Sequence, residues 1–131
     1  MIFLDTSAVY ALADRADPNH RLARRRFEAV VGAGESFLTH NYVLIESIAL
    51  LQHRLGTEVA RMFAEDARAF EVEWVTQALH EEAAARWEAA GRRHVSLVDA
   101  VSFQVMRRRQ LDTALAFDAH FTEAGFLLVG A

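Results

Sequence analysis

Short apolar runs alternate with longer amphipathic segments along the chain, and this alternation constrains the fold more than any other feature. The runs have the length and composition of buried strands, and the segments between them have the apolar spacing of helices. The expected strands are residues 2–4, 36–39, 70–75, 113–117 and 126–129. The expected helices are residues 8–14, 20–31, 41–55, 57–67, 77–90 and 96–109. Such alternation is typical of an α/β domain with a mainly parallel sheet covered by helices.

Length and composition narrow the classes of protein further. The 131 residues predict a single domain over residues 1–131. No apolar run approaches the roughly 20 residues that span a bilayer, and no basic leader precedes the first strand, so we expect a cytoplasmic protein without a membrane segment. The chain has no cysteine, and all 14 basic residues are arginine. Thiolate chemistry, P-loop nucleotide hydrolysis and Schiff-base chemistry are therefore excluded.

Four acidic residues interrupt or end apolar runs, namely Asp5, Glu46, Asp99 and Asp118. An ionised carboxylate among buried residues is costly unless it is paired, hydrogen-bonded or bound to a metal. In open parallel sheets the ligand site lies beyond the carboxyl ends of the strands, and Asp5 and Asp118 follow the first and fourth expected strands. We therefore expect the four acids to meet at one edge of the sheet and to bind a hard divalent cation.

Each acid also has a structural interpretation that requires no function. Asp5 and Asp118 can cap the helices that follow them. Ser96 and Asp99 have the spacing of a capping box. Glu46 can lie at the boundary of a helix face with its carboxylate in water. The occurrence of all four acids together favours a functional site over four unrelated structural roles.

The segments around these acids resemble the PIN domain family, and most closely the VapC-type toxin ribonucleases of bacterial toxin–antitoxin pairs. Met1–Ala8 is similar to the opening strand of the family with its first acid and following hydroxyl group. Asn41–Glu46, Ser96–Ala100 and Ala116–Phe121 are similar to the segments that carry the second, third and fourth acids. The four segments occur in the family order, and the resemblance covers nearly the whole chain.

This resemblance implies a fold, an activity and partners. The fold is a three-layer α/β architecture in which helices flank a parallel five-stranded sheet with the strand order 3-2-1-4-5. The activity is Mg²⁺- or Mn²⁺-dependent endoribonuclease cleavage of RNA, with the protein acting as the toxin of a toxin–antitoxin pair. The implied partners are the RNA substrate, a cognate antitoxin protein and a second copy of the chain in a homodimer.

The chemistry of clustered carboxylates suggests a role for each acid. Carboxylates close together raise one another's pKa values unless a cation such as Mg²⁺ or Mn²⁺ neutralises them. We expect Asp5 and Asp99 to bind the metal directly, and Asp118 to act as a further ligand or to accept a hydrogen bond from metal-bound water. Glu46 is expected to orient or deprotonate the attacking water, or to help hold a second metal. Thr6 positions Asp5, contacts a phosphate or serves only as a helix-start hydroxyl group.

Basic residues near the acids would bind the substrate. The net charge of −4 argues against general electrostatic attraction to nucleic acid but leaves room for a local basic patch. The candidates are Arg24–Arg26, Arg92–Arg93 and Arg107–Arg109, although any of these clusters can simply solvate a helix surface. The histidines show no metal-binding spacing. His120 lies beside the site in the sequence, and the sequence alone assigns it no catalytic role.

Other functions remain open from the sequence alone. The motif from Asp5 to Ser7 resembles that of haloacid-dehalogenase phosphatases, but Ser7 stands where that family needs a second aspartate. A non-catalytic RNA- or protein-binding PIN module and a PIN nuclease for RNA maturation or quality control are two further alternatives. The segments 42–55 and 59–63 carry more apolar residues than one sheet-facing stripe needs, which indicates either a dimer interface or burial within one chain.

Overall fold

The computed structural model describes residues 1–130 and contains one five-stranded parallel sheet with the strand order β3-β2-β1-β4-β5. The strands are β1 (Ile2–Leu4), β2 (Phe37–His40), β3 (Glu71–Glu73), β4 (Thr113–Leu115) and β5 (Leu127–Leu128). The helices are α1 (Thr6–Ala13), α2 (His20–Gly32), α3 (Asn41–Leu55), α4 (Thr57–Asp66), α5 (Gln77–Ala90), α6 (Leu97–Arg108) and α7 (His120–Glu123), with a short 3₁₀ turn at Ala67–Ala69. The predicted strand order and fold class are confirmed.

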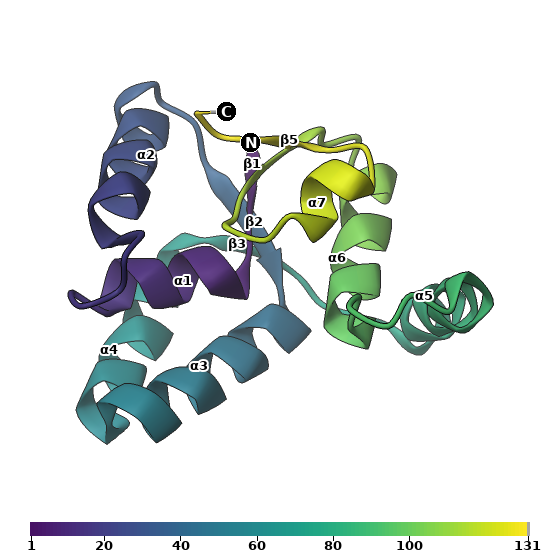
Figure 1. Ribbon diagram of the computed structural model, residues 1–131, viewed down its shortest axis with the longest axis horizontal. Helices are drawn as coiled ribbons and strands as arrows, with labels where there is room; N and C mark the ends of the chain where they lie inside the picture. The colour runs from purple at the N-terminus through teal and green to yellow at the C-terminus, as the bar shows by residue number, and fades with distance from the viewer. Residues whose placement is uncertain (131) are drawn as a thin grey trace.

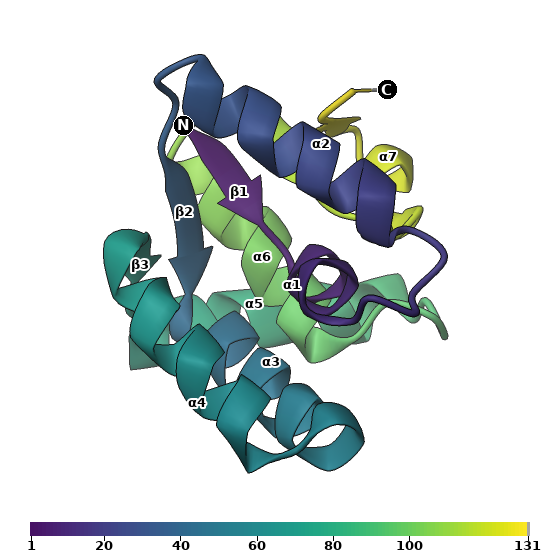
Figure 2. The same cartoon turned by 90° about the vertical axis from the view of Figure 1, so that its left-hand side faces the viewer.

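The central strand β1 determines where the site can form. It pairs in parallel with β2 on one side and with β4 on the other. Phe3 and Leu4 are 0% and 1% exposed, as expected for a strand buried on both faces of a parallel sheet. Figure 2 shows β1 and β2 running side by side in the same direction, toward the ends that lead into α1 and α3.

Successive residues of the strands pack against opposite helical layers because side chains alternate across a strand. Phe3 and Leu38 belong to one core cluster, together with side chains of α5, α6 and α7. Leu4 and Phe37 belong to a second cluster, together with side chains of α1, α2, α3 and α4. The sheet therefore lies between two groups of helices, which are visible on either side of β1 in Figure 1. This arrangement is the three-layer architecture that the resemblance implied.

The element boundaries differ from the expected ones in ways that matter for the site. The first helix begins at Thr6 rather than at residue 8, because Asp5 is its N-cap. β4 ends at Leu115, so Phe117 and Asp118 lie in the loop that follows. The helix α7 was not predicted, because a single turn leaves no apolar periodicity to detect. Within residues 1–130, no helix is both long and apolar enough to cross a membrane.

Candidate metal centre

Three of the four predicted acids converge beyond the carboxyl ends of the two central strands. Asp5 follows β1 directly, and its backbone N–H donates to the carbonyl of Leu115 at the end of β4, with a distance of 3.2 Å. Asp118 lies three residues after Leu115. Asp99 enters from the first turn of α6. This is the edge at which open α/β sheets bind their ligands.

Asp5 is held in place by Ser7. One carboxylate oxygen, Oδ2, accepts hydrogen bonds from the Ser7 backbone N–H at 3.0 Å and from the Ser7 hydroxyl at 2.6 Å. The same hydroxyl accepts a hydrogen bond from the Phe117 backbone N–H at 2.9 Å, so Ser7 connects the ends of β1 and β4. The capping interpretation of Asp5 is therefore correct. It leaves the other carboxylate oxygen, which accepts no hydrogen bond from residues 1–130, available to a cation.

Burial is the main influence on the electrostatic state of Asp5, and the neighbouring acids add to it. Burial of the side chain, which is 4% exposed, raises the pKa of Asp5 to about 6. The Ser7 hydrogen bonds oppose this shift, and the negative charges of Asp99 and Asp118 add to it. A divalent cation at this position would reverse the effect, since an opposite charge favours the ionised carboxylate.

Asp99 also combines a structural role with a place in the cluster. Ser96 accepts a hydrogen bond from the Asp99 backbone N–H, and Asp99 Oδ2 accepts one from the Ser96 backbone N–H, both at 3.1 Å. This capping box fixes the first turn of α6, as the sequence indicated. Asp99 is nevertheless only 8% exposed, and the same Oδ2 atom lies 3.2 Å from Nδ1 of His120.

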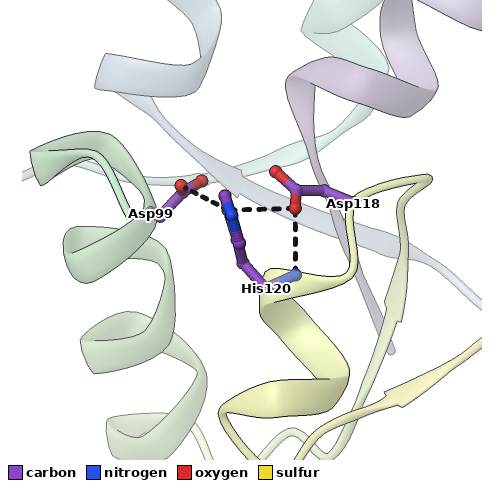
Figure 3. A group of neighbouring side chains, drawn as sticks. All are labelled: Asp99, Asp118 and His120. Atoms are coloured by element: carbon purple, nitrogen blue, oxygen red, sulfur yellow. Dashed lines mark hydrogen bonds and ion pairs between the residues drawn. The ribbon is translucent and has the colours of Figure 1, made fainter. Parts of the chain in front are cut away.

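The imidazole ring of His120 lies between Asp99 and Asp118 and contacts both carboxylates. Its Nδ1 atom lies 2.9 Å from Asp118 Oδ1 and 3.2 Å from Asp99 Oδ2, and its backbone N–H donates to Asp118 Oδ1 at 2.9 Å. Figure 3 shows the imidazole ring between the two carboxylates, with His120 at the start of α7. The sequence could not assign this histidine a role, since its approach to Asp99 depends on the packing of α7 beside α6.

The ligand atoms of Asp99, Asp118 and His120 lie within 4.8 Å of one another, which is close enough for all three to bind one ion. No other group of three or more histidine or acidic residues within residues 1–130 meets this condition. Asp5 is not a member of this group, but its buried carboxylate is close enough for the charges of Asp99 and Asp118 to raise its pKa. Carboxylate oxygens are the ligands that Mg²⁺ and Mn²⁺ prefer, so the donor set fits the predicted cation.

Glu46 stands apart from this group in the structure. Its side chain is exposed on α3, and it makes no hydrogen bond or ion pair with any residue among 1–130. The next residue, Ser47, is buried and donates a hydrogen bond to the Thr6 hydroxyl at 3.2 Å. The helix that carries Glu46 therefore packs beside the start of α1, next to Asp5. Thr6 contacts α3 through this bond and is 7% exposed.

The three arginine clusters lie in different environments. Arg92 and Arg93 line a cavity that also includes His120, so this cluster lies beside the acids. Arg109 is committed to ion pairs with Glu71 and Glu73 around β3. Arg24 pairs with Glu28 on the exposed surface of α2. Arg92 pairs with Glu123 at 2.8 Å, and Arg26 lies over the ring of Phe117, the residue before Asp118, so two of the three clusters each bring an arginine near the candidate centre.

One buried histidine has a structural role that the sequence did not reveal. His40 is 0% exposed and caps α3, with Nδ1 accepting hydrogen bonds from the backbone N–H groups of Tyr42 and Val43. Its Nε2 therefore carries the proton and donates to the Ser102 hydroxyl at 2.8 Å. Burial lowers the pKa of His40 to about 3, which keeps the ring neutral.

Comparison with known proteins agrees with this geometry. The model of the PIN domain family matches residues 2–127. The 23S rRNA-specific endonuclease VapC20 of Mycobacterium tuberculosis is 39% identical over an alignment of 134 positions, which covers 98% of this chain and 98% of that protein. The crystal structure of the M. tuberculosis sarcin–ricin loop cleaving toxin VapC20 has a TM-score of 0.82 and 36% identity, over 97% of each chain.

More distant structures share the fold alone. FitAcB of Neisseria gonorrhoeae has a TM-score of 0.68 and 15% identity, over 99% of this chain and 97% of its own. VapBC2 of Rickettsia felis, bound to a DNA fragment from its promoter, has a TM-score of 0.70 and 13% identity, over 98% of this chain and 97% of its own. From the family match and the identity to VapC20 together, the chain belongs to the PIN domain family and to its VapC branch.

Proposed function

We propose that this protein is a divalent-metal-dependent endoribonuclease that acts as the toxin of a toxin–antitoxin pair. The observation that supports this best is the convergence of Asp5, Asp99 and Asp118 at the carboxyl edge of the central strands, with His120 between two of them. A cluster of acids, of which Asp5 and Asp99 are buried, is costly to a fold unless a cation or a hydrogen-bond network compensates for it. Its presence at the ligand-binding edge favours chemistry over a purely structural role.

Asp5, Asp99 and Asp118 would hold Mg²⁺ or Mn²⁺, with His120 as a further ligand or as a donor to the carboxylates. The bound cation supplies Lewis-acid stabilisation of charge on a phosphoryl oxygen and lowers the pKa of a coordinated water. Ser7 fixes the orientation of Asp5, and the capping box fixes that of Asp99. Glu46, which is exposed on α3, would orient or deprotonate the attacking water, or help to hold a second metal.

The substrate of the relative suggests the substrate of this chain. VapC20 of M. tuberculosis is a 23S rRNA-specific endonuclease, and it matches almost the full length of this chain. We propose that the chain cleaves the sarcin–ricin loop of 23S rRNA, as that toxin does. Its place of action would then be the cytoplasm, where ribosomes are found.

Cleavage of an RNA hairpin with the sequence of this loop tests the activity. The protein should cleave the hairpin with Mg²⁺ or Mn²⁺ and lose activity in EDTA. Asp99→Asn should abolish most cleavage while the fold survives, because the variant loses a charged ligand. Asp112→Asn, which alters an exposed acid just before β4, is the matched control and should cleave normally. Undiminished cleavage in EDTA would contradict metal dependence.

The exposed apolar surface supports the proposed protein partners. Ile45 on α3, Val31 on α2 and Met62 on α4 are 68%, 54% and 54% exposed. A hollow of about 460 Å³ lies among α1, α2 and α4, with Phe27 and Phe63 in its wall. Exposed apolar surface of this kind favours an interface, which we assign to a homodimer and to the antitoxin.

Two measurements test these partners. Light scattering should give about twice the chain mass of 14.7 kDa. Expression of the chain alone should arrest growth of a bacterial host, and co-expression of a small protein encoded beside it should restore growth. A monomer that cleaves RNA but leaves the host unharmed would instead favour a PIN nuclease for RNA maturation.

A further inference from the structure

A cavity between α5 and α6 lies outside the acid cluster and has an unusual composition. Its volume is about 320 Å³, which is within the roughly 300–1,000 Å³ of small-ligand sites. The floor is apolar and includes Phe103 and Ala100 of α6, while Trp87 of α5 forms part of the wall. The ten lining residues include three arginines, Arg86, Arg92 and Arg107, and no acidic residue.

The aromatic wall of this cavity is fixed in orientation and accessible. The indole N–H of Trp87 donates to the backbone carbonyl of Val95 at 2.8 Å, which ties the ring to the loop before α6. The Trp87 side chain is still 39% exposed, so it is accessible from solvent. Gly91, in the left-handed conformation with φ of 57°, ends α5 and turns the chain into this loop.

The cavity is continuous with the surface beside the acids. Arg92 and Val95 line it, and they also line the neighbouring hollow that contains His120. Ala100, on its floor, follows Asp99 directly in the first turns of α6. Arg107 lies seven residues further along the same helix, about 10 Å away at 1.5 Å per residue. The cavity therefore extends along α6 away from the acid cluster.

From these features we propose that the cavity binds a nucleobase of the substrate RNA close to the cleaved bond. This inference rests on the ribonuclease function proposed above and adds a binding subsite to it. Sequence-selective RNA recognition relies on unstacked bases of loops that stack on aromatic side chains and on guanidinium planes. Trp87 supplies the stacking surface, and Arg86 and Arg107 supply positive charge for the phosphates on either side, while Arg92 is paired with Glu123 at 2.8 Å. The chain as a whole has a net charge of −4, so the positive charge of this cavity is a local feature that favours a polyanion such as RNA at this place.

Tryptophan fluorescence can test the contact directly, because the chain has only two tryptophans. Trp74 follows β3, is 67% exposed and lies outside the cavity lining, so Trp74→Phe leaves Trp87 as the only reporter. In an Asp99→Asn background, which keeps the RNA intact, the sarcin–ricin hairpin should quench Trp87 as it binds. The reciprocal Trp87→Phe variant leaves Trp74 as the reporter and should show no quenching. The opposite pattern would overturn the proposal.

Kinetics separate stacking from a structural role of Trp87. Trp87→Ala should raise KM for the hairpin roughly tenfold or more with a much smaller change in kcat, as expected for the loss of one stacked base. Trp87→Phe keeps an aromatic ring but loses the bond to Val95, and should retain most of the affinity. If Trp87→Phe is as impaired as Trp87→Ala, the indole acts by holding the loop, and the proposed stacking is wrong.

The same experiments separate this proposal from the one on which it rests. A protein that cleaves no RNA refutes the proposed function. A protein that cleaves the hairpin with an unchanged KM in Trp87→Ala refutes only the subsite. Quenching of Trp87 by the co-expressed antitoxin and not by RNA would identify the cavity as a protein-docking surface, and would also refute the subsite.

Discussion

The buried position of Asp5 destabilises the ionised form of its carboxylate and so raises its pKa. Burial holds the pKa of Asp5 near 6, against 3.8 for an unperturbed aspartate. At neutral pH the protein must therefore keep an ionised carboxylate in a place that disfavours it. Each pKa unit corresponds to about 1.4 kcal/mol, so this cost is at most about 3 kcal/mol in the metal-free protein.

Asp5→Asn should therefore stabilise the metal-free protein by about 1–3 kcal/mol at pH 7. Asparagine keeps the N-cap, since its side-chain oxygen can still accept the Ser7 hydrogen bonds. For an acid whose pKa is raised in the fold, the destabilisation grows as pH rises from about 4 to 6. The advantage of the variant should thus vanish near pH 4. Urea unfolding in EDTA at both pH values measures it, and a variant that is less stable at pH 7 would contradict the argument.

His40 makes the opposite contribution to pH dependence. Its pKa is about 3 in the fold and 6.5 in the unfolded chain, so acid favours the unfolded state, which binds the proton more readily. The contribution of His40 to the free energy of unfolding should be fully present above pH 6.5 and should decrease as pH falls toward 3. At pH 5 the decrease should be about 2 kcal/mol. His40→Asn retains a capping oxygen and removes the titration. Urea unfolding at pH 7 and pH 5 should show a smaller loss in this variant than in the parent.

At the scale of elements, the start of α6 supports both helix stability and the position of Asp99. Ser96→Ala removes the side-chain half of the capping box and should cost about 1 kcal/mol of unfolding free energy. Cleavage should fall less than in Asp99→Asn, since the carboxylate remains and only its orientation loosens. Thermal melting and hairpin cleavage measure the two effects, with Ser96→Thr as the control that keeps the cap. A Ser96→Ala variant as inactive as Asp99→Asn would mean that the cap is essential to the site.

The elements with a clear apolar pattern were the ones that the sequence could predict. β1 and α6 were predicted close to their observed bounds because strand burial and helix spacing leave direct traces in the residue order. The single turn of α7 leaves no such trace, and the role of His120 depends on it. Asp5 and Asp99 were each given a capping and a metal-binding interpretation. The capping interpretation is confirmed for both, and their place in the acid cluster depends on tertiary packing that residue order does not encode. The metal-binding role of the acids, including that of Glu46, stays a prediction.

For the molecule as a whole, a cation that binds only the folded state should raise the melting temperature. At a hundredfold excess over Kd the added stability is roughly 2.7 kcal/mol. Calorimetry with Mn²⁺ should show the rise, while NaCl of equal ionic strength should not. His120→Ala should require about 10- to 100-fold more Mn²⁺ for the same shift. A melting curve that does not respond to millimolar Mn²⁺ would show that the acids do not form a preassembled site.

The position of β1 at the centre of the sheet also has a consequence for synthesis. Asp5 is translated more than a hundred residues before Asp118 and His120. The acid cluster cannot assemble until β4 has been synthesised and has paired with β1. Under the function proposed above, the ribosome that translates this chain would meet an assembled acid cluster only after β4 has docked. The proposed antitoxin would then need to act only from the moment when β4 docks.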